Sequence, residues 1–592
     1  MPVGETTKML HFGRFPYTEQ ISEVFRMAWY DEAIFYHIYP LGLLNAPKEN
    51  AYDGVTHRLK ELTPWIDHIK EIGCNALYVG PLFESVGHGY ETTDYRKLDS
   101  RLGDNEDLKD FVKKCHDKGV RVILDGVFNH TGRDFFAFKD LKENRENSRY
   151  RDWYCNVNFY GNNEYNDGFS YANWGGYNLL VKLNQRNPEV KDYIADTIRF
   201  WVKEFDIDGL RLDAADVLDF DFMKMLRSVA QEVKPEFWLM GEVIHGDYSR
   251  WVNEGTLHSV TNYVMHKAFY SGHNDHNYFE IAHTQRRLEG MGKSGGSGFK
   301  LYNFVDNHDV ERIYTKLLNK AHFTPVHILL YTMPGIPSIY YGSEFAIEGR
   351  KEKSSDASLR PALELGDFKD AVKNNPATRL IAALGKVRSR TPELSYGDYR
   401  ELLLTNRQYA FSRNHNGRSV IVTVNNDDGS YTMTLPAGNA PSYMGALSGE
   451  CVNVSGGNIQ VTVQGNSGEI WVPVDPDEKR EPAGAPEVIV SGISVKSAGS
   501  QKKPEDKEKT GQNGAGAEAG AACESKEGEK KEPEKKGAET DDRTYQEGMI
   551  AGLQEAIIAI MEKNGPVTDQ MRRDVYNNTH HDSLITWIKS FR

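Results

Sequence analysis

The stretch VILDGVFNHTG, residues 122–132, changes character halfway along its length. Its first half is apolar around one acid, Asp125, as in a buried strand. Its second half begins with Asn129 and His130 and suits an exposed turn. A strand that carries polar groups to its carboxyl end is typical of α/β folds that place a site there. The stretch therefore predicts such a fold, and other strands should end in the same way.

Short apolar runs alternate with longer amphipathic stretches from about residue 31 to residue 344, the pattern of strand and helix in a parallel α/β protein. Segments 55–73 and 188–205 are examples of the helices. The predicted strands are residues 33–40, 76–81, 121–130, 208–216, 237–243, 259–263, 301–309 and 337–344. Eight strands with intervening helices predict a (β/α)8 TIM barrel over residues 31–374, after an N-terminal extension of residues 1–30.

The third strand of the predicted barrel is followed by a long connection, residues 131–186, which we assign to an inserted subdomain. It is rich in Tyr, Trp, Asn and Gly, as in WYCNVNFYGNNEYNDGFSYANWGGYNLL, residues 153–180. So many aromatic residues argue against disorder. Two interpretations stay open: a small packed unit without ligand contact, or a unit whose aromatic side chains help to wall a cleft.

The pattern changes twice after the barrel. Short alternating strands separated by Gly, Asn and Asp predict an antiparallel β-sandwich domain over residues 375–474. Lys, Glu, Pro, Gly and Ala then dominate residues 475–541, which predicts a disordered charged linker. Helical periodicity returns in residues 542–592, a small helical module that packs on itself, on another copy of the chain, or on a protein partner.

The net charge of -14 gives no reason to expect nucleic acid or a membrane as a partner, since both favour a basic surface. The first residues lack a secretory signal pattern. The cysteines are scattered, odd in number and without CxxC spacing, which predicts free thiols, no bound metal and a cytoplasmic location. They are Cys74, Cys115, Cys155, Cys451 and Cys523.

Four of the predicted strands deliver ionisable or polar groups to their carboxyl ends. These groups are Asp125, Asn129 and His130; Arg211 and Asp213; Glu242; and His308 and Asp309. Carboxylates gathered at one mouth suit cleavage of a glycosidic bond, in which one acid protonates the leaving oxygen and another meets the positive charge at the anomeric carbon. Neighbouring strands lie about 4.7–4.9 Å apart, close to the ~5–5.5 Å that a retaining enzyme needs, so Asp213 and Glu242 are plausible partners.

The strand ends also carry four short motifs. The segments DGVFNH (125–130), DGLRLDAAD (208–216), GEV (241–243) and FVDNHD (304–309) resemble, in order and spacing, the motifs of the α-amylase superfamily, glycoside hydrolase family thirteen. The resemblance covers roughly residues 33–474. Each motif alone is weak, whereas the four together are highly specific.

This resemblance implies roles for three acids and for the residues around the sugar. Asp213 would be the nucleophile, Glu242 the general acid/base with a raised pKa, and Asp309 the acid that stabilises the transition state. Arg211 would keep Asp213 ionised and oriented. The residues that it assigns to substrate binding are His88, Tyr90, His130, Arg211 and His308.

Supporting residues are also implied, and here the chain departs from the family pattern. Asp125 would tie loops together. Calcium-binding relatives use the asparagine at Asn129, an aspartate where this chain has Lys182, and the residue that is Val217 here. An ammonium group can bridge the oxygens that calcium would bind, and valine offers no side-chain ligand. We therefore expect no calcium at this site, no other cofactor, and a bridge from Lys182 to Asn129.

The runs KLNQRNPEV (182–190) and GEVIHGDYSRW (241–251) look like the cyclomaltodextrinase, neopullulanase and maltogenic amylase branch, whose members act on short or cyclic maltodextrins. That branch usually carries an N-terminal β domain, which we expect to be missing here. The resemblance implies a retaining α-glucan hydrolase that cleaves α-1,4 bonds in maltooligosaccharides or cyclodextrins. The alternatives are a 4-α-glucanotransferase, which passes the same covalent intermediate to a sugar hydroxyl, and a non-catalytic amylase-like scaffold.

Overall fold

The computed structural model describes residues 28–292, 298–353, 355–474 and 481–484. Its central sheet consists of eight parallel strands in the order β11-β10-β9-β5-β2-β1-β13-β12. These strands are β1 (Phe35–Ile38), β2 (Ala76–Val79), β5 (Arg121–Gly126), β9 (Gly209–Leu212), β10 (Trp238–Gly241), β11 (Ser259–Val260), β12 (Tyr302–Phe304) and β13 (Ile336–Tyr340). A parallel bridge between Thr261 and Tyr302 joins the two edges. The predicted TIM barrel is confirmed, and each strand overlaps one of the eight predicted runs.

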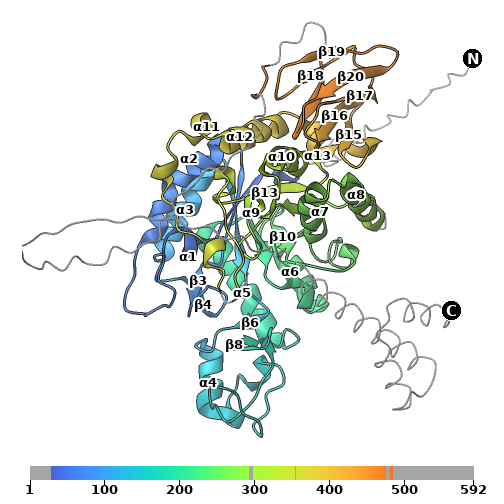
Figure 1. Ribbon diagram of the computed structural model, residues 1–592. Coiled ribbons are helices and arrows are strands. Elements are labelled where there is room, and N and C mark those ends of the chain that lie inside the picture. Colours follow the sequence, from blue (N-terminus) through green and yellow to red (C-terminus); the bar gives the residue numbers. More distant parts are fainter. Residues whose placement is uncertain (1–27, 293–297, 354, 475–480, 485–592) are drawn as a thin grey trace, which may run out of the picture. The chain divides into compact units, whose positions relative to one another are not determined.

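Helices surround this sheet (Figure 1). Helix α5 (Pro188–Phe205) shows why they form where they do. The Asn187 side chain accepts the Glu189 N–H, proline occupies the first helical position, and the helix buries Ile194, Ile198 and Trp201. The other helices are α1 (Pro40–Leu43), α2 (Thr63–Glu71), α3 (Asn105–Asp117), α6 (Phe220–Val233), α7 (Tyr263–Asn274), α8 (Tyr278–Gly292), α9 (Ile313–Lys316), α10 (Phe323–Thr332), α11 (Ala371–Asn374), α12 (Pro376–Ser389) and α13 (Pro392–Tyr396).

The connection after the third barrel strand folds into a small unit of its own. It contains helix α4 (Phe136–Asn144) and a three-stranded sheet in the order β6-β8-β7. The strands are β6 (His130–Thr131), β7 (Asn173–Trp174) and β8 (Tyr177–Lys182). Phe138, Tyr154 and Phe169 pack in its core, whereas Tyr165 and Tyr177 remain exposed. Packing therefore uses only part of its aromatic content. A separate hairpin, β3 (Phe83–Ser85) and β4 (Thr92–Leu98), precedes α3.

The C-terminal domain is antiparallel, as predicted. A six-stranded sheet in the order β14-β15-β16-β21-β18-β19 and the pair β17-β20 enclose a core that includes Ile421, Ile459 and Trp471. The strands are β14 (Asp398–Leu404), β15 (Gln408–His415), β16 (Arg418–Asn425), β17 (Tyr431–Pro436), β18 (Ser442–Gly445), β19 (Cys451–Asn453), β20 (Asn458–Val463) and β21 (Ser467–Val474).

The predicted start of this domain at residue 375 is wrong. Residues 376–389 form helix α12, which packs against the barrel helix α10, and the first strand of the domain begins only at Asp398. Helix α12 buries Leu380, Ile381 and Leu384, so it belongs to the helical layer of the barrel by its packing.

Most of the predicted N-terminal extension 1–30, the linker 475–541 and the helical module 542–592 lie outside the described residues. The proposals of a tethered tail and of a partner for its helices therefore stay predictions. In the described part of the chain, every helix is too short or too polar to cross a lipid bilayer.

Candidate active site

Three neighbouring strands bring charged side chains to one edge of the barrel. Asp125 in β5 lies opposite Arg211 in β9, and Arg211 lies opposite Met240 in β10. Side chains two residues apart on a strand point to the same face, so Asp213 follows Arg211 on the inner face. Glu242 comes directly after β10. The four charged residues that the motifs predicted therefore meet where the strands end.

A single guanidinium group links the three carboxylates. Arg211 Nη1 lies 2.9 Å from Asp125 Oδ1 and 3.0 Å from Asp213 Oδ1, and its Nη2 lies 2.9 Å from Glu242 Oε2. The backbone N–H of Ala214 also donates to Glu242 Oε2 at 3.1 Å. Ala214 has a left-handed φ of 46°, an unusual backbone for a residue with a side chain and one that recurs at functional sites. The two terminal nitrogens of the planar Arg211 guanidinium thus hold Asp213, the candidate nucleophile, and Glu242, the candidate acid.

The electrostatics of this cluster favour a retained proton. Burial raises the pKa of Asp213 and of Glu242, while Arg211 opposes both shifts and the neighbouring carboxylates add to them. Burial also raises the pKa of Asp125, whereas Arg211 and the hydroxyl groups of Tyr78 and Tyr90 act to lower it. Three buried acids share one cation, so the cluster should hold a proton at a pH where isolated carboxyls have lost theirs.

Tyr90 and His308 lie beside this cluster, as predicted from the sequence. The Tyr90 hydroxyl is 3.2 Å from Asp125 Oδ2 and 2.5 Å from His308 Nε2. Tyr78, which sequence reasoning placed only in a buried strand, donates to the same Asp125 oxygen at 2.8 Å. His308 Nε2 is 3.0 Å from Asp309 Oδ2, and burial lowers the pKa of His308 well below its usual value. Asp125 therefore supports the site through two hydroxyls and an arginine.

The third acid has a partner that sequence reasoning missed. Arg360 Nη2 lies 2.9 Å from Asp309 Oδ1 and 3.2 Å from Asp356 Oδ2, while its Nε donates to the His308 carbonyl. Its guanidinium also lies 4.7 Å from the centre of the Tyr39 ring. The only sequence signal was an Asp and an Arg four residues apart after the last strand, which is common on any surface. Arg360 gives Asp309 the kind of cationic partner that Arg211 gives Asp213.

His88 lies at the margin of this group. Its carbonyl accepts the Tyr39 hydroxyl at 2.6 Å, and its Nε2 lies 3.0 Å from Glu91 Oε1. About half of its side chain is exposed, unlike that of His308. The motifs assign His88 and His308 to the binding of a sugar. Of the two side chains, His88 is the one exposed to solvent.

Asn129 and Lys182, two of the residues at the family calcium position, lie on paired segments but do not form the predicted bridge. Asn129 is fully buried, and its Oδ1 has no hydrogen-bond partner. Its carbonyl accepts the Leu183 N–H at 3.0 Å, and His130 pairs with Lys182 across strands β6 and β8. The insertion is thus anchored through the main chain, and the expected bond from Lys182 to the Asn129 side chain is absent. Neighbouring strands share backbone bonds while their long side chains remain free to point elsewhere.

This donor set does not fit calcium. Ca²⁺ takes six to eight oxygen ligands, several of them carboxylate. Here Asn129 offers one free buried oxygen, Lys182 brings a positive charge instead of an oxygen ligand, and Val217 has no side-chain donor. Burial, with smaller contributions from His88 and Lys182, lowers the pKa of His130 to about 3. The His130 Nε2 is buried and without a hydrogen-bond partner, and the lowered pKa favours the neutral imidazole.

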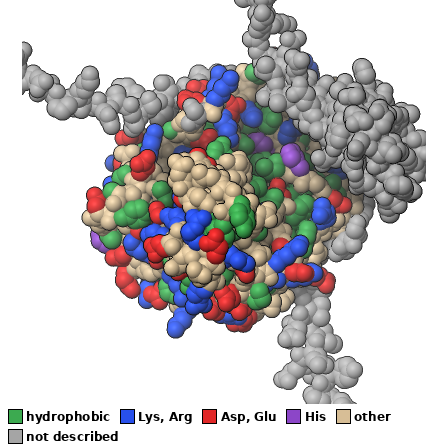
Figure 2. Space-filling view, turned by 90° about the horizontal axis from the view of Figure 1, so that it is seen from below, with side chains coloured by type: hydrophobic (Ala, Val, Ile, Leu, Met, Phe, Trp, Pro, Cys, Tyr) green, Lys and Arg blue, Asp and Glu red, His purple; other side chains and the backbone are tan. Residues whose placement is uncertain are grey.

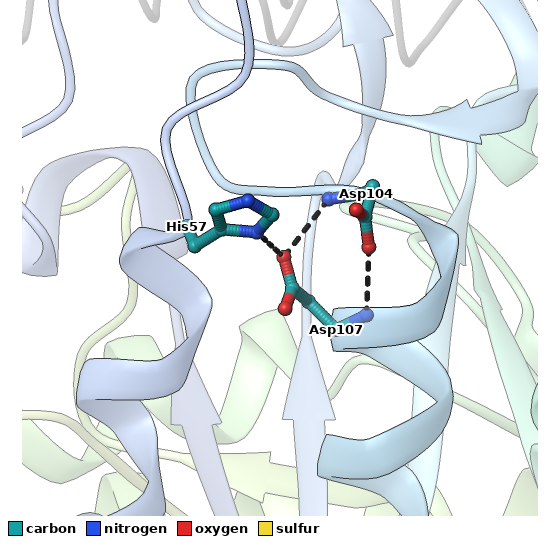
Figure 3. A group of neighbouring side chains, drawn as sticks. All are labelled: His57, Asp104 and Asp107. Atoms are coloured by element: carbon teal, nitrogen blue, oxygen red, sulfur yellow. Dashed lines mark hydrogen bonds and ion pairs between the residues drawn. The ribbon is translucent and has the colours of Figure 1, made fainter.

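A second group of potential metal ligands lies on the outside of the barrel. His57, Asp104 and Asp107 bring their side chains together at the start of α3 (Figure 3). The Asp104 carboxylate accepts the Asp107 N–H at 3.1 Å, and Asp107 Oδ2 accepts the Asp104 N–H at 3.0 Å and pairs with His57. Lys60 Nζ lies 3.1 Å from the other Asp107 oxygen and would repel a cation. We interpret this group as a helix cap.

A cavity of about 500 Å³ lies between α2 and the segment 363–371. Its walls include Leu43, Trp65, His68 and Phe368. None of the acids at the strand ends lines it. The cavity is therefore not the place where the acid cluster would meet a substrate.

A TIM barrel with acids around one arginine at its strand ends is the arrangement that the four motifs predicted for a glycoside hydrolase. The catalytic domain of the alpha-amylase family matches residues 38–392. A cyclomaltodextrinase from Thermoanaerobacter pseudethanolicus is 32% identical over 439 residues, which cover 70% of this chain and 74% of the relative. Neopullulanase 2 from Thermoactinomyces vulgaris is 30% identical over 479 residues, 76% of this chain and 79% of the relative. A solved structure of a cyclomaltodextrinase aligns with a TM-score of 0.66 at 26% identity, covering 75% of this chain and 78% of that one.

The chain belongs to the α-amylase family of glycoside hydrolases. The resemblance that the four motifs predicted is confirmed, including the branch that contains cyclomaltodextrinases and neopullulanases. The match to the family ends at residue 392, which agrees with the packing of α12 against the barrel.

Proposed function

We propose that the protein is a retaining hydrolase of α-glucans that cleaves α-1,4 bonds in maltooligosaccharides or cyclodextrins. The observation that carries this proposal is the bridge from Arg211 to both Asp213 and Glu242. A shared guanidinium brings the two carboxyl groups to one place, which supports a mechanism that uses both on one sugar. The names of the relatives, cyclomaltodextrinase and neopullulanase, support an α-glucan as the substrate class.

In the first half-reaction, Asp213 attacks the anomeric carbon while Glu242 gives its proton to the leaving oxygen. Arg211 favours the ionised form of Asp213 against the burial that raises the pKa of this carboxyl, and burial favours the protonated form of Glu242. The glycosyl-enzyme bond forms as the glycosidic bond breaks. In the second half-reaction, Glu242 takes a proton from water, whose oxygen attacks the anomeric carbon and releases Asp213.

Asp309 and its partners act on the sugar rather than on the bond. About a third of the Asp309 side chain is exposed, so it can accept hydrogen bonds from hydroxyl groups. Arg360 and His308 fix its position. A carboxylate held in place beside a sugar with developing positive charge stabilises that charge without having to reorganise.

The test is the product pattern from maltotriose, cyclodextrin, pullulan and sucrose, measured with the wild type and with Asp213→Asn. We expect glucose and maltose from maltotriose, and a loss of rate of more than about a thousandfold in the variant, because an amide cannot form the glycosyl ester at a useful rate. Oligomers longer than maltotriose, in excess over glucose and maltose, would indicate a 4-α-glucanotransferase instead. An unchanged rate in Asp213→Asn would show that the catalytic assignment of Asp213 is wrong, whereas a wild type that cleaves none of the four substrates would leave the scaffold interpretation.

We also propose a cytoplasmic location. The four cysteines that the structure describes are free thiols, and Cys74 and Cys115 are buried, which suits a reducing compartment. Recovery of the protein from the culture medium, with the cytoplasmic fraction empty, would contradict this proposal.

A further inference from the structure

Asp125 is the most deeply buried of the three acids around Arg211. Its side chain has no exposed surface, whereas those of Asp213 and Glu242 are 11% and 14% exposed. The backbone of Gly80 packs so closely against it that a Cβ at this glycine would collide with the Asp125 side chain. A carboxylate without water keeps its charge only where hydrogen-bond donors and cations replace that water. Asp125 therefore depends on its protein partners more than the other two acids do.

Three side chains donate to the Asp125 carboxylate. Arg211 Nη1 lies 2.9 Å from Oδ1 and 3.2 Å from Oδ2, and the hydroxyls of Tyr78 and Tyr90 lie 2.8 and 3.2 Å from Oδ2. Two of these donors are shared, because Arg211 also contacts the other two acids and Tyr90 also contacts His308. Among the residues that the structure describes, Asp125 is the hydrogen-bond partner of the Tyr78 hydroxyl. Tyr78 is thus the donor dedicated to this acid.

Tyr78 is fixed by the packing of its ring. It lies in β2 and is only 2% exposed. Its ring stacks on that of His37 in β1, with the ring centres 4.2 Å apart and the planes inclined by 20°. Burial raises the pKa of Tyr78 well above its usual value, so the hydroxyl keeps its proton and remains a donor. A donor held by packing on a barrel strand can set the position of its acceptor.

The ionisable groups that face Asp125 come from β2, β9 and β10 and from the connection between β3 and β4. They are Tyr78, Arg211, Asp213, Glu242 and Tyr90. Burial raises the pKa of Asp125, while Arg211 and the two hydroxyls act to lower it. Charged side chains of both signs are intermixed on the face that carries the inserted subdomain (Figure 2), so this surface does not favour one sign of charge. The contacts of Asp125 therefore decide its charge more than the distant surface does.

We propose that Tyr78 is a positioning residue whose hydroxyl keeps Asp125 charged and in place. The charged Asp125 holds Arg211 where it contacts both Asp213 and Glu242, so the proton that the cluster retains stays on Glu242, where the leaving oxygen needs it. Without the hydroxyl, Asp125 takes up a proton more readily, and a neutral Asp125 holds Arg211 less firmly. The inference rests on the proposed function, because it explains how the acid/base keeps its proton.

The experiment compares Tyr78→Phe, Asp125→Asn and the double variant in the full chain with a matched control, Tyr302→Phe. Tyr302 of β12 is also a buried barrel tyrosine, but its hydroxyl lies 2.6 Å from Ser338 Oγ instead of a carboxylate. The rate constant kcat and KM are measured on maltotriose across the pH profile. The midpoint of thermal unfolding of each variant is measured over the same pH range.

We expect kcat of Tyr78→Phe to fall about tenfold at the pH optimum, with KM within about twofold of the wild type because Tyr78 does not touch the substrate. The acid limb of kcat/KM should move to higher pH by about one unit, because a hydrogen bond to a charged group is worth about one pKa unit or more. Tyr302→Phe should match the wild type in both respects.

The double variant tests whether Tyr78 acts through Asp125. In the Asp125→Asn background the carboxyl group is absent, so Tyr78→Phe should no longer move the acid limb. An acid limb that stays in place in Tyr78→Phe would overturn the inference. The same shift with and without the Asp125 carboxyl would overturn it as well, because Tyr78 would then act on another group.

The midpoint of thermal unfolding separates this inference from the proposed function. Tyr78→Phe should lower the midpoint where Asp125 is charged, and the difference from the wild type should shrink as the pH falls, because a protonated Asp125 needs the donor less. A wild type that cleaves no α-glucan but shows this pH dependence would refute the proposed hydrolase and keep the role of Tyr78. An active enzyme with a difference that does not depend on pH would refute the role of Tyr78 alone.

Discussion

At the scale of single residues, the site depends on the geometry of one arginine. Arg211 contacts Asp125, Asp213 and Glu242 through two terminal nitrogens. A planar guanidinium can serve acids on both sides at fixed angles, whereas a lysine offers a single point charge. Arg360 makes a similar arrangement around Asp309 and Asp356. The positions of the acids are therefore set by their cationic partners as much as by the strands.

A prediction at this scale concerns calcium. Lys182 and Val217 stand where calcium-binding relatives supply oxygen ligands, and the Asn129 oxygen alone cannot hold the ion. Incubation with a chelator, followed by gel filtration, should leave kcat/KM on a maltodextrin and the midpoint of thermal unfolding unchanged. Activity that is lost with the chelator and returns with added calcium would show that the proposal of no cofactor is wrong.

At the scale of elements, the N-terminus of α3 illustrates how a helix end is fixed. Asp104 and Asp107 exchange hydrogen bonds with each other's backbone, and His57 and Lys60, which come from a segment before α2, pair with Asp107. Burial acts to raise the pKa of Asp107, but these partners together lower it below the usual carboxyl range. The ionised form is therefore favoured in the folded protein.

We predict that Asp107→Asn destabilises the folded protein by about 1 kcal/mol at pH 7, because it removes the ionic contacts and weakens the cap. A carboxyl whose pKa is lowered on folding stabilises the protein above its unfolded pKa, near 4, and this contribution is lost as the pH falls through the folded value. The difference in unfolding midpoint between variant and wild type should therefore shrink below about pH 4. Asp110→Asn, at an exposed position of the same helix, is the control and should change little at either pH. A difference that does not depend on pH would contradict the argument.

At the scale of the whole described molecule, the barrel and the C-terminal domain meet at helix α10. Arg413 Nη1 donates to the Thr332 carbonyl at 2.7 Å and its Nε donates to the Gly397 carbonyl at 3.0 Å. Arg388 donates to the Tyr331 carbonyl at 2.6 Å. Two buried arginines thus satisfy carbonyl groups at the end of α10, and burial lowers the pKa of Arg413 to about 9.

We predict that Arg413→Leu lowers the free energy of unfolding by about 2 kcal/mol, because two buried carbonyl groups lose their donor. The midpoint of thermal unfolding is the measurement, and kcat/KM of the folded variant should be unaffected since Arg413 is far from the acid cluster in sequence and fold. Arg407→Leu, which removes a half-exposed arginine from the same domain, is the control. An unchanged midpoint for Arg413→Leu would mean that the cost of burying the cation cancels its hydrogen bonds.

Much of this organisation could be predicted because it follows local patterns. Apolar runs with polar ends identified all eight barrel strands, since buried strands must be apolar and site residues follow them directly. The boundary at residue 375 failed although helix α12 has local signals, a cap at Asn375 and a proline at its first position, because only packing against α10 assigns this helix to the barrel. Arg360 and Tyr78 were missed because neither carries a local signal of its role.

The sequence by itself determined the family, the barrel and the identity of the acids, because these depend on residue types at fixed positions along strands. The tertiary structure decided which cation each acid contacts, that Asn129 anchors the insertion through its main chain, and that Tyr165 and Tyr177 remain on the surface. Those features depend on contacts between segments far apart in the chain. A side chain's partner and its exposure are set by what folds against it, and no local pattern records that.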